Sequence, residues 1–83
     1  MDVKDRIVVV TGAAGGIGRA LAQRFAQAGA KTVVCVDIDE EGAKRTAEEV
    51  GGVGLRLDVA DEAATGALIE KVETEIGPID LYC

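Results

Sequence analysis

A short aliphatic run leads directly into a glycine-rich turn near the beginning of the chain, reading IVVVTGAAGGIG over residues 7–18. The run at Ile7–Val10 is continuous and β-branched, which predicts a strand buried on both faces, as in a parallel sheet. After the turn, apolar side chains recur at helical spacing at Ile17, Leu21, Phe25 and Ala28. This spacing predicts a helix with these side chains on its apolar face, so a strand, a glycine turn and a helix follow one another without a linker.

The rest of the chain repeats this alternation of short apolar runs and helical patterns. Further strands are predicted at residues 32–36, 53–57 and 79–83. Asp39 and Asp61 are candidate N-caps for two further helices, which Gly51 and Gly77 are expected to end. Short strands that alternate with longer helices predict parallel strands joined by right-handed crossovers. The whole chain is therefore predicted to be one α/β unit with four strands and three helices.

The crossovers also predict how the helices are distributed over the sheet. The first two crossovers turn the same way, which places the first two helices on one face. The third runs back past the first strand and places its helix alone on the other face. Much of that second face and the edge of the fourth strand are therefore expected to lie open, which would favour association or poor solubility.

The composition excludes several classes of site. The 83 residues include no His, which rules out catalytic arrangements and zinc sites that need an imidazole, and two cysteines cannot build a closed four-cysteine zinc site. A net charge of −6 disfavours nucleic acid and anionic membrane surfaces as partners. Cys35 lies in an apolar run far from Cys83, which favours two reduced thiols in a cytoplasmic protein. The apolar runs are too short for a signal peptide or a membrane helix.

The glycine turn and the acid that ends the second strand together indicate nucleotide binding. Glycines allow backbone angles closed to other residues, a close approach of the backbone to a pyrophosphate, and tight packing of the helix on the strand. The free N–H groups and the positive end of the helix dipole then hold the anion. Asp37 follows Gly16 by about 20 residues, the spacing expected for a carboxylate that hydrogen-bonds a ribose diol. The turn is not GxGxxG, because Leu21 takes the place of the last glycine, and it is not a P-loop.

Three segments resemble the short-chain dehydrogenase/reductase family, and the resemblance spans the entire chain. TGAAGGIG at residues 11–18 resembles the TGxxxGIG turn of that family, Asp58-Val59 resembles its Asp-Val pair, and residues 77–81 resemble the approach to its fourth strand. The resemblance implies a Rossmann-type, three-layer doubly wound parallel sheet that is incomplete, with its first four strands and three helices. It also implies a set of cofactor-binding residues, which are Gly12, Ala14, Gly16, Ile17, Gly18, Asp37, Ile38, Asp58 and Val59. Of these, Ile38 is expected to pack against the adenine, and Asp58 to meet the adenine amino group.

Asp37 predicts NAD rather than NADP as the cofactor. A carboxylate can accept hydrogen bonds from both hydroxyls of the adenosine ribose of NAD, whereas NADP carries a dianionic phosphate at this place. Like charges about 4 Å apart cost up to ~4 kcal/mol at an effective dielectric near ~20, which predicts a ~100- to 1,000-fold preference for NAD. Members of the family that accept NADP usually carry a basic residue where this chain has Gly15.

The catalytic residues of the family have no counterpart in this sequence. In the family a Tyr acts as acid and base beside a Lys four residues further on, and a Ser orients the substrate oxygen. The chain has no Ser and no Asn, and Tyr82 is followed by a single residue. The resemblance therefore implies that residues 1–83 are the N-terminal part of a single NAD(P)-binding Rossmann domain whose remainder is absent, and that this part is inactive. For the full-length protein it implies hydride transfer between a nicotinamide cofactor and a small-molecule alcohol or ketone, in a homo-oligomer.

Three other interpretations stay open. The spacing of Gly12, Gly15 and Gly18 also fits the TGxxGxxG turn of the epimerase-like branch, although Ile17 and residues 77–80 favour the shorter branch of alcohol and ketone oxidoreductases. A non-catalytic nucleotide-binding or sensing module would carry the same turn, because the discriminating residues lie downstream. A methyltransferase is disfavoured by the Thr-Gly start and the Gly-Ile-Gly close of the turn.

Overall fold

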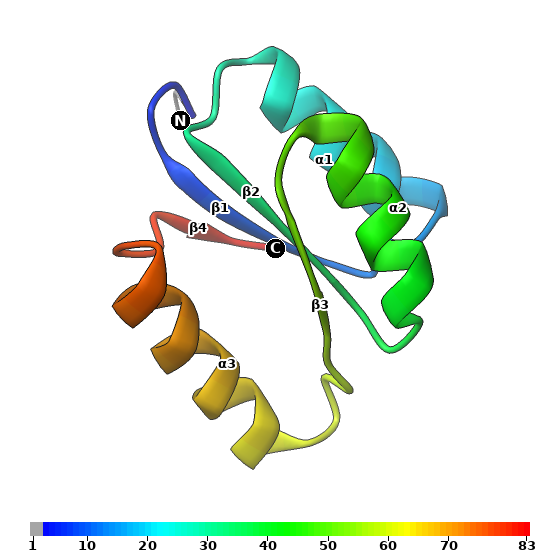
Figure 1. Ribbon diagram of the computed structural model, residues 1–83, viewed down its shortest axis with the longest axis vertical. Helices are drawn as coiled ribbons and strands as arrows, with labels where there is room; N and C mark the ends of the chain where they lie inside the picture. Colours follow the sequence, from blue (N-terminus) through cyan, green and yellow to red (C-terminus); the bar gives the residue numbers. More distant parts are fainter. Residues whose placement is uncertain (1–2) are drawn as a thin grey trace.

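The computed structural model describes residues 3–83 and confirms the predicted alternation of strands and helices (Figure 1). The elements are β1 (Ile7–Thr11), α1 (Gly16–Gln27), β2 (Thr32–Asp37), α2 (Glu40–Val50), β3 (Val53–Arg56), α3 (Glu62–Glu75) and β4 (Leu81–Tyr82). The four strands form one parallel sheet in the order β3-β2-β1-β4. The chain therefore moves outward from β1 to β3 and then crosses back to pair β4 with β1.

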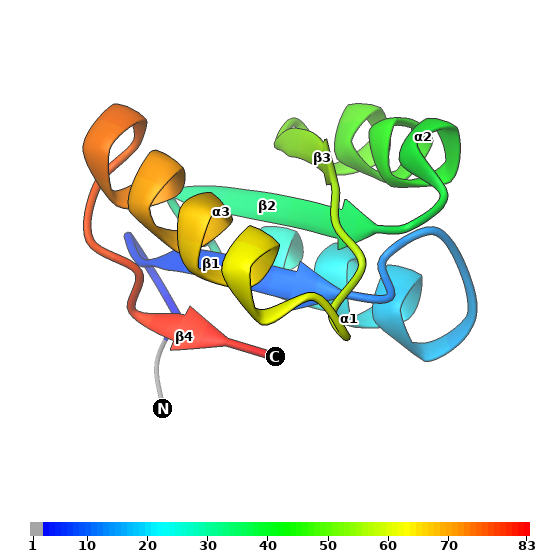
Figure 2. The ribbon, with the colours of Figure 1, turned by 90° about the horizontal axis from the view of Figure 1, so that it is seen from below.

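The sheet is the middle of three layers. Figures 1 and 2 show α1 and α2 together on one side of the sheet and α3 alone on the other, as predicted. The side chains of β1 alternate between these layers: Val8 and Val10 belong to the core cluster beneath α1 and α2, and Ile7 and Val9 to the cluster beneath α3. Both clusters are apolar, which explains why β1 is a continuous run of aliphatic residues. This is the predicted doubly wound α/β fold.

The predicted caps set the ends of α2 and α3. The Asp39 carboxylate accepts a hydrogen bond from Gly42 N at 3.1 Å, and the Asp61 carboxylate accepts one from Ala64 N at 3.0 Å. Gly51 ends α2 in the left-handed conformation, with φ at 68°. Gly77 follows α3 with a φ of 146°, and its N–H donates to Val72 O at 3.0 Å. The ends of both helices are therefore set by capping aspartates and terminating glycines that can be recognised in the sequence.

The apolar face predicted for α1 is wrong except at Phe25. Ile17 is 82% exposed and Leu21 is 36% exposed, while the side chain buried against the sheet is Ala22. Phe25 and Ala26 pack partly buried beside it. The helix approaches β1 so closely that small side chains make the contact, and a pattern that follows the largest apolar residues places the buried face one step out of position.

Two of the predicted strands are shorter than expected. β4 covers Leu81–Tyr82 rather than residues 79–83, although Asp80 N donates to Ile7 O at 2.9 Å and Cys83 N donates to Val9 O at 2.8 Å on either side of it. β3 ends at Arg56 rather than Leu57, whose N–H still donates to Asp37 O at 3.0 Å. These hydrogen bonds continue the ladder beyond the strand ends.

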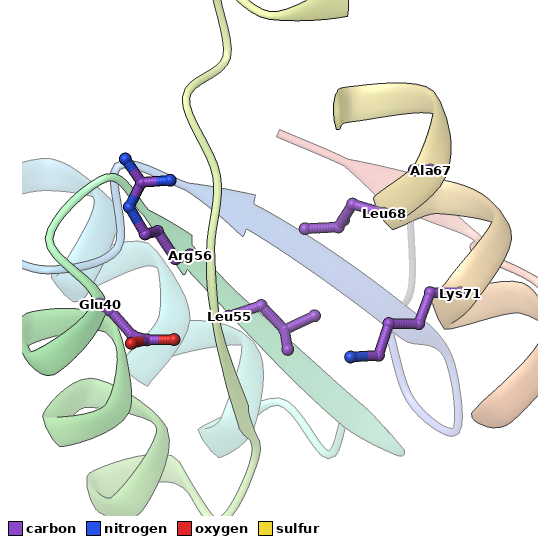
Figure 3. Close-up of a pocket in the computed structure, with 6 residues that line it drawn as sticks. All are labelled: Glu40, Leu55, Arg56, Ala67, Leu68 and Lys71. Atoms are coloured by element: carbon purple, nitrogen blue, oxygen red, sulfur yellow. The ribbon is translucent and has the colours of Figure 1, made fainter. Parts of the chain in front are cut away.

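The second face of the sheet is covered more completely than expected. Val9, Val34 and Val36 are fully buried on it, because Leu68 and Val72 of α3 reach over the middle strands. Beside a hollow of about 290 Å³ at Val53 and Glu75, a groove of about 300 Å³ stays open between β3 and α3 (Figure 3). Its lining residues are Glu40, Leu55, Arg56, Ala67, Leu68 and Lys71. Within residues 3–83, none of the helices has the length and apolar character needed to cross a membrane.

Two glycines with opposite surroundings test the packing between the elements. A Cβ at Gly54 would lie 2.7 Å from Lys44 Cα, because β3 packs directly on the backbone of α2, whereas a Cβ at Gly66 of α3 would meet nothing within 4 Å. We expect Gly54→Ala to lower the free energy of unfolding by about 1–3 kcal/mol through overpacking. Gly66→Ala should raise it by up to about 1 kcal/mol through helix propensity. Urea denaturation of the intact protein measures both, and a neutral Gly54→Ala would contradict the close contact.

Candidate functional site

The carboxyl ends of β1, β2 and β3 meet at one edge of the sheet, where the predicted site residues gather (Figure 1). A hollow of about 170 Å³ lies at this edge, lined by Gly12, Asp37, Ile38, Leu57, Asp58 and Val59. Five of these six residues belong to the predicted set. Leu57 was not predicted as a site residue. It could have been found from its position, because it is the last residue of the predicted third strand and directly precedes Asp58.

The glycine turn adopts a backbone that requires glycine at specific points. Gly12 and Gly16 have φ angles of 66° and 57°, in the left-handed region that side chains disfavour. Gly18 is required for a different reason, since a Cβ there would collide with the Gly12 carbonyl group. The predicted roles of glycine in strained angles and in close packing of helix on strand are therefore both present.

The N-terminus of α1 differs from those of the other two helices. Gly15 is the N-cap of α1 and supplies no side-chain hydrogen bond, and the first turn contains no acidic residue. In α2 and α3 an Asp side chain caps the helix, and at least one Glu follows in the first turn. The first N–H groups of α1 and the positive end of its dipole therefore have no side-chain anion beside them, which suits an external anion.

The Asp37 carboxylate joins the glycine turn to the end of β2. Its Oδ2 accepts a hydrogen bond from Ala14 N at 3.0 Å, and its Oδ1 accepts one from Asp39 N at 2.9 Å. An ionised carboxylate offers about four lone-pair sites, so each oxygen keeps the capacity to accept another hydrogen bond. Asp37 is half-buried and lines the hollow. Its geometry is suited to a neighbouring pair of hydroxyl donors.

Apolar side chains at the site are unusually exposed. The three most exposed large apolar side chains within residues 3–83 are Ile17 at 82%, Val59 at 61% and Ile38 at 57%, and all three belong to the predicted set. Ile38 and Val59 line the hollow beside Asp58, whose Oδ1 accepts a hydrogen bond from Ala60 N at 3.0 Å. A hollow lined by exposed aliphatic side chains and two carboxylates can hold a flat heterocycle and direct a carboxylate to its edge.

One residue near the site, Thr46, was missed by sequence reasoning. Thr46 of α2 is buried, and its Oγ1 donates to Ala13 O at 2.6 Å. The available signal was a hydroxyl residue beside Ala47 on the apolar stripe of α2. Arg19, in the first turn of α1, pairs with Glu49 of α2 through two hydrogen bonds, one of them from Nε to Oε1 at 2.8 Å. This pairing raises the pKa of Arg19 and lowers the pKa of Glu49, and it directs the guanidinium towards α2.

Within residues 3–83, no group of three His, Cys, Asp or Glu side chains could hold a metal ion. Tyr82 lies on β4 and is 40% exposed. The chemistry that these residues offer is therefore binding: a helix N-terminus without a side-chain cap, a carboxylate facing a hollow, and exposed apolar side chains beside it.

Comparison with known proteins identifies the same fold and family pattern. A family model described as short chain dehydrogenase matches residues 6–82. The 3-oxoacyl-[acyl-carrier-protein] reductase FabG of Escherichia coli K12 is 40% identical over 98% of this chain, which covers 34% of that protein. The chain therefore spans about a third of the length of the curated relatives it matches.

Solved structures give the same result. A hydroxysteroid dehydrogenase from Escherichia coli superposes with a TM-score of 0.85 and 32% identity, over 96% of this chain and 36% of that one. A structure named as ribose-5-phosphate isomerase from Brucella melitensis 16M superposes with a TM-score of 0.90 and 40% identity, over 99% of this chain and 32% of that one. The names of these proteins thus state different substrates and reactions on one shared fold.

The core thiol provides a test of the packing behind the site. Burial of Cys35, together with the nearby charge of Glu49, raises the pKa of its thiol from 9.0 to about 11. We expect Cys35 to resist alkylation at pH 8 in the folded protein, where only about one thiol in a thousand is ionised, and to react after denaturation. The stabilisation from the neutral thiol is fully present below pH 9 and is lost as the pH rises towards 11. Peptide mass spectrometry measures the labelling, and rapid labelling of folded protein would contradict the burial.

Proposed function

The chain belongs to the short chain dehydrogenase family, and from this premise we propose that residues 1–83 are the NAD-binding N-terminal part of an oxidoreductase. The complete protein would transfer hydride between the nicotinamide cofactor and a small-molecule alcohol or ketone, as a homo-oligomer. The observation that carries the proposal is Asp37, a carboxylate at the end of β2 that faces the hollow beside an uncapped glycine turn. When bound, the cofactor supplies the hydride chemistry.

Each part of the site has a role in this proposal. The N–H groups at the start of α1 and in the glycine turn bind the pyrophosphate, which Gly18 allows by keeping the helix close to β1. The Asp37 carboxylate accepts hydrogen bonds from the ribose diol. Ile38 and Val59 enclose the adenine ring, and Asp58 accepts a hydrogen bond from its amino group. All these residues serve the adenosine and pyrophosphate half of the cofactor.

The range of activities among the relatives supports assigning this part of the chain to the cofactor. A reductase, a dehydrogenase and a protein named as an isomerase share 32% to 40% identity with it, although the reactions that their names state are different. A segment that is similar across different reactions is suited to a shared ligand rather than to a particular substrate.

The preference for NAD over NADP follows from the position of Asp37. The carboxylate is held by the backbone N–H groups of Ala14 and Asp39, so it stays at the edge of the hollow where an extra phosphate of NADP would lie. At a separation of about 4 Å this repulsion costs up to ~4 kcal/mol at an effective dielectric near ~20. Part of that cost is relieved by solvent and salt.

Replacing Asp37 by Asn tests the cofactor preference. The substitution removes the charge, and because Asn has one acceptor oxygen it also loses one of the hydrogen bonds from Ala14 N and Asp39 N. That local change affects both cofactors alike, so the ratio of the NADP to the NAD dissociation constant reports the charge, and we expect it to fall by ~100- to 1,000-fold. Asp61→Asn is the matched control, because it removes the same charge from a helix cap outside the hollow, and Asn caps helices as well as Asp does. Titration of the intact protein with both cofactors gives the ratio, and an unchanged ratio in Asp37→Asn would refute the ribose role.

Catalytic activity is expected to require more than residues 1–83. They contain no Ser and no Tyr-x-x-x-Lys segment, and both are needed for proton transfer and substrate orientation in the family that the sequence resembles. We therefore expect the 83-residue chain to show no oxidation or reduction of NAD above background with any alcohol or ketone, while the intact protein turns over. Absorbance of the reduced nicotinamide monitors both, and turnover by the 83-residue chain alone would show that catalytic groups lie within it.

A further inference from the structure

Thr46 is the buried polar side chain that the proposed cofactor site does not explain. It lies on α2 and is 1% exposed, in a core that is otherwise apolar within residues 3–83. Its Oγ1 donates a hydrogen bond to Ala13 O at 2.6 Å, across 33 residues of sequence. Burying a hydroxyl without a hydrogen-bond partner costs free energy, so the partner indicates what the buried group stabilises. That partner is the backbone of the glycine turn.

The turn is held at both of its middle residues. Ala13 is fully buried, and its N–H donates to Val36 O at 3.1 Å while its carbonyl oxygen accepts from Thr46. Ala14 N donates to Asp37 Oδ2 at 3.0 Å. Ala13 therefore has both backbone polar groups bound, one to β2 and one to α2. On either side of these residues, Gly12 and Gly16 have φ angles of 66° and 57°, in the left-handed region that favours glycine.

The face of α2 that carries Thr46 lies directly against the turn. One helical turn earlier, Gly42 is so close that a Cβ there would lie 2.6 Å from Ala14 Cβ. Gly42 and Thr46 are four residues apart, and both are buried, so they share one face of α2. Gly42 sets how near the helix comes, and Thr46 supplies the hydrogen bond at that distance.

We propose that Thr46 is a positioning residue for phosphate binding, whose hydroxyl holds the glycine turn in the conformation that directs its amide groups to a pyrophosphate. This inference rests on the proposed function. Without the hydroxyl, the Ala13 carbonyl is buried without a partner, and the turn relieves this by rotating that peptide group towards solvent. The Ala14 N–H belongs to the same peptide group and loses its hydrogen bond to Asp37 Oδ2, and the amide groups that follow are displaced. Binding of the pyrophosphate must then order the turn again, which lowers the affinity.

The effect is specific to the phosphate part of the ligand. The residues proposed for adenosine, Asp37, Ile38, Asp58 and Val59, follow β2 and β3 and make no hydrogen bond to Thr46. Asp37 is also held by Asp39 N at 2.9 Å, independently of the turn. Loss of the Thr46 hydroxyl should therefore weaken the binding of ligands that carry a pyrophosphate far more than the binding of adenosine, because Asp37 keeps its hydrogen bond from Asp39 N. A general loss of stability would weaken both.

Titration of the intact protein with ADP and with adenosine tests the proposal. We expect Thr46→Val to raise the dissociation constant of ADP by about 10-fold and to change that of adenosine by less than about 2-fold. Thr46→Ser should restore the ADP affinity to within about 3-fold of wild type. Thr65→Val is the matched control. Thr65 Oγ1 also donates to a backbone carbonyl, Asp61 O, at 3.0 Å, but this hydrogen bond is exposed and lies on α3. This control should leave the affinities for ADP and for adenosine unchanged. Thr46→Ala removes the same hydroxyl without a branched side chain and serves if Thr46→Val does not fold.

Each outcome assigns the result to one cause. ADP affinity unchanged in both Thr46→Val and Thr46→Ala overturns the positioning role, and so does an equal loss of ADP and adenosine affinity. Failure of Thr46→Ser to restore ADP binding also overturns it, because the hydroxyl would then not be the group that matters. A wild-type protein that binds neither NAD nor ADP refutes the proposed function itself, and the positioning role falls with it.

Discussion

The close approach of α1 to the end of β1 controls both the packing of the first helix and the geometry of the candidate site. Gly18 has no space for a Cβ beside the Gly12 carbonyl group, so the helix begins almost on the strand that it follows. This places the uncapped N-terminus of α1 at the carboxyl edge of the sheet, and it forces small side chains such as Ala22 into the contact with the sheet. The absence of a Cβ at Gly18 therefore places the helix N-terminus that is proposed to bind an anion, and it also determines how the rest of α1 packs on the sheet.

The turn that makes this approach possible is held by side chains from outside it. Asp37 accepts the Ala14 N–H from the end of β2, and Thr46 donates to the Ala13 carbonyl from α2. The shape of the turn thus depends on β2 and α2 being in place, which joins folding to the proposed binding of a nucleotide. Asp37 has two tasks in this arrangement, because the same carboxylate that closes the turn faces the hollow. Substitution of such a residue alters both the local structure and the proposed ligand preference.

Much of the fold could be predicted because its signals are local. The aliphatic run of β1, the caps Asp39 and Asp61, and the left-handed Gly51 each act through their own neighbours, and the structure has them as predicted. The sequence was less informative about features that depend on how helices pack against the sheet. The buried face of α1 was assigned by side-chain size, although distance to the sheet selects small residues, and the coverage of Val9 and Val36 by α3 depends on the position of a helix in space.

The order of the elements, the parallel sheet and the residues that gather at its carboxyl edge can be predicted from the amino-acid sequence, because periodicity, caps and glycine angles are properties of short segments. Three contacts depend instead on how the elements pack: Leu57 completes the hollow, Arg19 turns to Glu49, and Thr46 pairs with Ala13. These contacts join residues about 30 or more positions apart, or residues on separate strands. Their partners are chosen by the distance between packed elements, which no local pattern encodes.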